Sequence, residues 1–80
     1  MHIERLVTMA NDIGNFFAAE PKKEDAIAGI RNHMSKFWEK RMSDQIYAHL
    51  AAHKGEGLSP LVLEAVKQMA AAEQQSRPAA

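Results

Sequence analysis

Apolar residues recur at helical spacing through the first twenty residues of this 80-residue chain, and this periodicity is the strongest constraint on its fold. Residues three or four positions apart share one face of an α-helix, so such a run predicts an amphipathic helix. The apolar positions of this run are Ile3, Leu6, Val7, Ala10, Ile13 and Phe17. We therefore expect a helix over about residues 2–19, ended by Pro21. Gly14, inside it, indicates close approach by another helix.

Two further stretches continue the helical spacing. The second helix is expected over about residues 22–36, with a stripe made of Ala26, Ile27, Ile30, Met34 and Phe37. A third carries on one face Met42, Ile46, His49, Leu50 and His53. Propensity alone allows one unbroken helix through both, but that helix would be long for so small a domain, so we expect a bend near Trp38–Lys40. The segment 54–57 contains two glycines that suit a left-handed helix end.

The fourth helix has the clearest start signal. Ser59 is a favourable N-cap, and Pro60 suits the first helical position. Its stripe consists of Val62, Ala65, Val66, Met69 and Ala70. Periodicity is lost after residue 70, and no stretch alternates as a strand would. The sequence thus predicts an all-α fold, a small bundle of three to four helices, with residues 1–70 as a single helical domain and 71–80 as a flexible, disordered C-terminal tail.

Composition removes several classes of function. The chain has no Cys, which excludes disulfides, thiolate metal sites and cysteine nucleophiles. Its ten basic and ten acidic residues balance, whereas a nucleic-acid binder normally carries a basic excess. The N-terminus shows no signal segment, and no apolar run approaches the roughly 20 residues of a membrane span. We therefore expect a cytoplasmic protein that binds neither nucleic acid nor membrane.

Sites for chemistry are weakly specified. His49 and His53 are four apart and share a helix face, a spacing that can hold a metal ion, but no further ligand is placed near them. Solvated or cap-adjacent histidines are the simpler interpretation. Ser59 is explained by capping, and no nucleophile-base-carboxylate set is specified. We expect no catalytic residues, no metal, no cofactor and no enzymatic activity.

Four of the five aromatic residues form two adjacent pairs, Phe16-Phe17 and Phe37-Trp38. Neighbours on a helix point about 100° apart, so a small chain has difficulty burying both members of each pair. The stripes predict that Phe17 and Phe37 are buried. The remaining group, with residue types common at protein interfaces, is predicted to bind a partner and consists of Phe16, Trp38, Arg41 and Met42.

Several strings, in their order and spacing, carry a family resemblance. They are LVTMANDIGNFF at residues 6–17, AIAGI at 26–30 with His33, Phe37-Trp38 with Arg41-Met42, and GLSPLV at 57–62 with Ala65-Val66. Together they span about residues 6–69, and the chain resembles the delta subunit of cytoplasmic NAD-dependent, molybdenum-containing formate dehydrogenase. That family often carries Asp-Pro after the Trp, where this chain has Glu39-Lys40, which weakens the case for a sharp helix break.

The resemblance implies a non-catalytic accessory subunit that binds the molybdenum-containing catalytic subunit and supports its assembly or stability. In that family the catalytic subunit holds the molybdenum cofactor and iron–sulfur clusters, and another subunit carries flavin and binds NAD. Without Cys, this chain is not expected to hold a cluster. Two alternatives remain: a transient assembly chaperone, and a free-standing homodimeric interaction protein whose second copy covers the exposed apolar surface.

Overall fold

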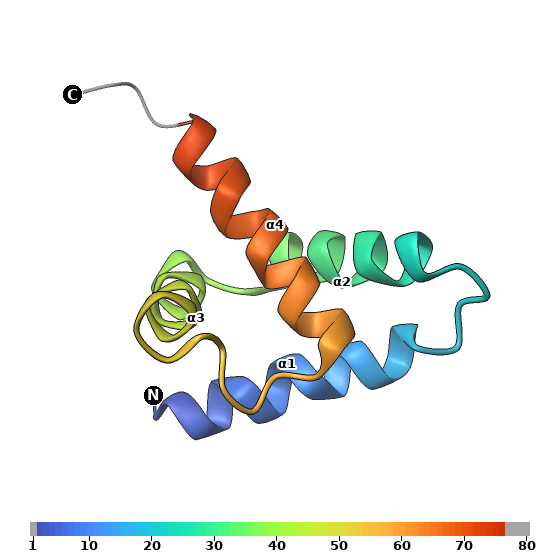
Figure 1. The fold of residues 1–80 in the computed structure, drawn as a ribbon, viewed down its shortest axis with the longest axis horizontal. Coiled ribbons are helices and arrows are strands. Elements are labelled where there is room, and N and C mark those ends of the chain that lie inside the picture. Colours follow the sequence, from blue (N-terminus) through green and yellow to red (C-terminus); the bar gives the residue numbers. More distant parts are fainter. Residues whose placement is uncertain (1, 77–80) are drawn as a thin grey trace.

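Four helices make up the fold in a computed structural model that describes residues 2–76 (Figure 1). They are α1 (Ile3–Phe17), α2 (Lys23–Phe37), α3 (Lys40–His53) and α4 (Pro60–Ser76). No strand occurs within those residues, so the predicted all-α class is confirmed. α4 continues to Ser76, past the helix end predicted near residue 70, because its Ala- and Gln-rich end favours helix. The last four residues of the predicted tail, 77–80, lie outside the described part.

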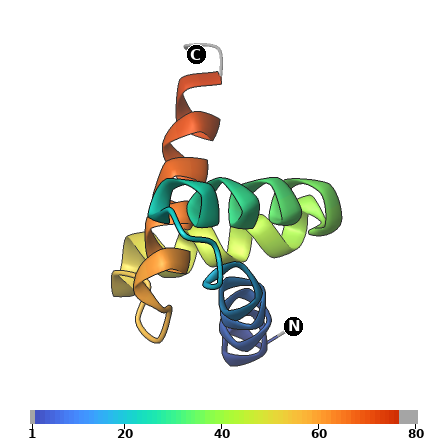
Figure 2. The same cartoon turned by 90° about the vertical axis from the view of Figure 1, so that its right-hand side faces the viewer.

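The helices cross one another rather than running parallel. α1 and α2 run in opposite directions, while α3 is viewed almost along its axis and α4 crosses diagonally over α2 (Figure 1). The view turned by 90° confirms that the C-terminal end of α4 projects beyond the other three helices (Figure 2). α4 contacts each of the other helices, so it closes the core.

Each helix contributes side chains to one core. The largest that are fully buried are Leu6, Ile30, Met34, Ile46, Val62 and Val66, all of them positions on the predicted stripes. Gly14 lies where α1 meets α4, since a methyl group added there would collide with the side chain of Val62. The predicted close approach at Gly14 is therefore confirmed.

α2 and α3 are separated by a complete break, although no proline is present. Trp38 (φ −86°, ψ 133°) and Glu39 (φ −68°, ψ 153°) are both extended. The Trp38 backbone N–H closes the last turn of α2 on the carbonyl of Met34, at 2.9 Å, and the chain then turns away. The expected bend is thus a change of direction through two non-helical residues.

This break reverses the predicted roles of the second aromatic pair. Trp38, predicted to lie at the surface, is 9% exposed and packs in the core, whereas Phe37, predicted to be buried, is 70% exposed. The prediction was wrong because it extended the helical period through Trp38, whose extended backbone aims the indole elsewhere. In the first pair Phe16 is 76% exposed, as predicted, and Phe17, predicted to be buried, is half-buried against the core.

Two hydrogen bonds of the Asn11 side chain, which we call the Asn11 clamp, join the loop between α3 and α4 to α1. Its Nδ2 donates to the carbonyl of Gly57, at 2.9 Å, and its Oδ1 accepts from the backbone N–H of Ser59, also at 2.9 Å. One amide therefore satisfies a loop carbonyl and an N–H that precedes α4. The loop itself turns through left-handed residues at Lys54 (φ 58°), Gly55 (φ 72°) and Gly57 (φ 90°), which confirms the predicted left-handed end of the third helix.

Trp38→Ala is expected to destabilise the fold by about 3–5 kcal/mol, because it empties a buried indole site. The neighbouring change Phe37→Ala is the matched control, with an expected loss of about 1 kcal/mol or less, because its ring is mostly in water. Urea unfolding followed by far-ultraviolet circular dichroism measures both free energies. Equal losses would contradict the assignment of Trp38 to the core.

Asn11→Ala is expected to lower the free energy of unfolding by about 1–2 kcal/mol, since two hydrogen bonds are lost. Asn15→Ala, one turn later on α1 and exposed, carries the same change in helix propensity and serves as the control. If Asn11→Ala and Asn15→Ala have the same free energy of unfolding in the same urea titration, the Asn11 clamp contributes nothing to stability.

Candidate functional site

Four rings, two of them exposed and two half-buried, form a continuous row along α1 and α2, which we call the aromatic row: Phe16, Phe17, His33 and Phe37. The centroids of Phe16 and Phe17 lie 5.0 Å apart in an edge-to-face arrangement. Phe17 and His33 follow at 6.4 Å, and His33 and Phe37 at 4.7 Å. Such distances are those at which aromatic rings attract one another.

Gly29 explains how the row is seated. A methyl group added at Gly29 would collide with the ring of Phe17, so this ring lies directly on the backbone of α2. Gly29, His33 and Phe37 follow one another at intervals of four and therefore share a face of that helix. Because Gly29 has no side chain, the end of α1 approaches α2 closely enough for Phe17 to reach His33.

Both ends of the row are open to solvent. Phe16 and Phe37 are the large apolar side chains that stand exposed among residues 2–76, at 76% and 70%. Beside Phe16 is a hollow of about 240 Å³ lined by Ile13, Phe16, Phe17 and His33. Exposed aromatic rings beside an apolar hollow are typical of a surface that another protein covers.

The four residues that the sequence predicted as the partner-binding group differ in their exposure. Phe16 and Arg41 are exposed, Met42 is half-buried against the core, and Trp38 lies inside it. No stacking of Arg41 on Trp38 occurs in the described part of the chain, because Trp38 is outside the helix that carries Arg41.

Sequence reasoning missed His33 and Phe37 as surface residues. The available signal was their spacing of four on one helix, which places the two rings side by side. That signal was masked because Phe37 also fits the buried stripe of α2.

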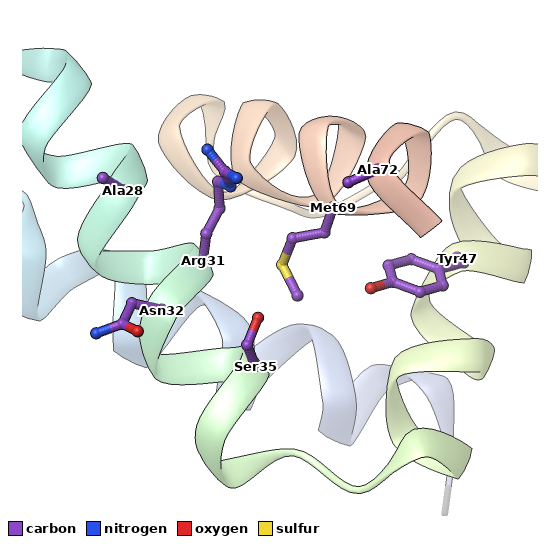
Figure 3. A pocket seen from close by; sticks show the side chains of 7 residues that line it. All are labelled: Ala28, Arg31, Asn32, Ser35, Tyr47, Met69 and Ala72. Carbon is purple, nitrogen blue, oxygen red and sulfur yellow. The ribbon is translucent and has the colours of Figure 1, made fainter. Parts of the chain in front are cut away.

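A second hollow, of about 390 Å³, lies between α2, α3 and α4 and is more polar (Figure 3). Its lining consists of Ala28, Arg31, Asn32, Ser35, Tyr47, Met69 and Ala72. The Tyr47 hydroxyl points into it toward Met69 (Figure 3). Arg31 donates from Nη1 to Gln68 Oε1 at 3.0 Å, which holds the guanidinium against α4.

Tyr47 is the residue whose ionisation this hollow alters. Burial raises the pKa of its hydroxyl above 10.0, and the carboxylates of Glu73 and Asp44 raise it further, while a hydrogen bond with Ser43 acts in the opposite direction. These carboxylates also oppose binding of an anion beside Tyr47, so the donors of the hollow do not amount to an anion site.

The two histidines of α3 lie near the C-terminal end of that helix. Nε2 of His49 donates to the carbonyl of Glu56 at 2.7 Å, and the rings of His49 and His53 lie 5.6 Å apart. Within residues 2–76 no group of three or more His, Cys, Asp or Glu side chains is arranged to hold a metal ion. His49 therefore supports the loop that follows α3.

None of the helices in residues 2–76 combines the length and apolar character needed to cross a bilayer.

Residues 5–66 match the family model described as the NADH-dependent formate dehydrogenase delta subunit, FdsD. The matched range contains α1 from residue 5 onward, all of α2 and α3, and the first part of α4, and so includes the whole aromatic row. Comparison with curated proteins and with solved structures returns no match.

Tyr47→Phe is expected to reduce the loss of stability at alkaline pH. The pKa of Tyr47 is higher in the folded than in the unfolded protein. The contribution of Tyr47 to the free energy of unfolding is therefore complete below pH 10.0, and it is lost as the pH rises through the pKa of the folded state. Urea unfolding of wild type and Tyr47→Phe, at neutral pH and at about pH 11, measures this difference. Parallel declines in the two proteins would contradict it.

Proposed function

This chain belongs to the family of NADH-dependent formate dehydrogenase delta subunits, and on this basis we propose that it is a non-catalytic accessory subunit. It binds the catalytic subunit of the dehydrogenase, which the family resemblance implies contains molybdenum, and supports the assembly or stability of the complex in the cytoplasm. The observation that carries the proposal is the pairing of this family match with two exposed phenylalanines inside the matched range.

The aromatic row is the proposed contact surface. Covering one largely exposed phenylalanine contributes roughly 1.5–3 kcal/mol, so Phe16 and Phe37 together could supply a substantial part of a binding free energy. Aromatic anchors of this kind frequently dominate protein interfaces. A marginal domain that leaves both rings in water gains from a partner that removes them from it.

The other members of the sequence-predicted group take different parts in this proposal. Arg41 is exposed and is the second residue of α3, just beyond the break, so it suits the polar rim of the same contact. Trp38 and Met42 act indirectly, since both pack on the core. By holding the break in place, Trp38 turns Phe37 outward.

Purification of the native complex tests the proposal. A tagged chain expressed in its host should recover the catalytic subunit in near-stoichiometric amount, together with its molybdenum, measured by elemental analysis. Recovery of the chain only as a homodimer, seen by sedimentation, would favour a free-standing interaction protein. Presence in immature but not in active complex would instead identify a transient assembly chaperone.

Phe16→Ala and Phe37→Ala are each expected to weaken association with the catalytic subunit by roughly tenfold or more, because each removes an aromatic anchor. Lys67→Ala, at an exposed position on α4, is the matched control and should leave the affinity unchanged. Binding is measured by titration of the purified catalytic subunit, with unfolding measured in parallel. Unaltered affinity in both Phe variants would rule out the aromatic row as the contact.

A further inference from the structure

His33 is the polar member of the aromatic row and lies in its middle, between Phe17 and Phe37. It is half-buried, and its ring nitrogens have no hydrogen-bond partner within the described part of the chain. By contrast, every fully buried side-chain nitrogen or oxygen in that part of the chain has a hydrogen-bond partner, so the unpartnered His33 nitrogens are not fully buried. The His33 nitrogens are therefore in contact with water in the free protein.

A partner that covers Phe16 and Phe37 must also remove this water. Every protonation state of an imidazole carries at least one N–H donor, whereas only the neutral ring carries an acceptor. A donor deprived of water without a replacement weakens binding by on the order of tenfold. The contact thus requires a group that can accept a hydrogen bond from His33.

We propose that the segment of the catalytic subunit that covers the aromatic row is apolar, with one hydrogen-bond acceptor oxygen placed opposite His33. This inference rests on the proposed function and gives its contact a chemical identity. The hollow beside Phe16 receives the apolar part, since it is lined by Ile13 and the two phenylalanines as well as by His33. A carboxylate or a backbone carbonyl supplies the oxygen.

Two substitutions separate the donor from the ring. His33→Phe keeps an aromatic ring beside Phe17 and Phe37 but removes the donor, while His33→Gln keeps a donor and removes the ring. In a titration against the purified catalytic subunit, His33→Phe should bind roughly tenfold more weakly than wild type and His33→Gln within about threefold. Equal or tighter binding by His33→Phe, or weaker binding by His33→Gln than by His33→Phe, overturns the inference.

Phe16→Ala and Phe37→Ala, measured in the same titration, test the aromatic row as the contact separately from the acceptor oxygen opposite His33. If both weaken binding and His33→Phe does not, the aromatic row remains the contact and only the acceptor is excluded. If neither Phe variant changes the affinity, the aromatic row and the acceptor opposite His33 are both excluded, while association with the catalytic subunit through another surface stands.

The source of the oxygen follows from added salt. At a pH low enough to charge the imidazole, screening by salt reduces the affinity ratio between wild type and His33→Phe when the acceptor is a carboxylate, and leaves it nearly constant when the acceptor is a carbonyl. Circular dichroism of each variant confirms that the helices are retained.

Discussion

Burial of Trp38 at the junction of α2 and α3 is the constraint on which the arrangement of the other parts depends. The indole reaches the core only because Trp38 and Glu39 are extended, and those two residues set the direction in which α3 leaves α2. In a chain of this size, without disulfides, one buried aromatic of this volume is a large share of the available core. The same turn leaves Phe37 in water.

Each adjacent aromatic pair is divided between core and surface. Phe17 packs inward on Gly29 while Phe16 faces solvent, and Trp38 packs inward while Phe37 faces solvent. Because His33 lies between the two pairs, their outward members end a single row instead of two isolated spots. In this way two short aromatic pairs can provide both side chains that stabilise the core and exposed rings that a partner could contact.

The sequence predicts the helices well, because a buried stripe repeats in every turn and each helix has one. It also predicts the divided pairs, since neighbours on a helix cannot face the same way. It misassigns Phe37 and Trp38 because no local residue marks the break, which tertiary burial of the indole stabilises. Asn11 was missed for a related reason: an amide that bridges two distant backbone groups leaves no periodic trace, although it joins the residue before α4 to α1.

The Asn11 clamp also bears on the order in which the chain assembles. It joins α1 to residues 46 and 48 positions later, so it forms only after three helices have been synthesised and brought together. Interactions made late in folding slow unfolding more than they speed folding. If the clamp forms after the transition state for folding, it lengthens the lifetime of the closed bundle by slowing its unfolding.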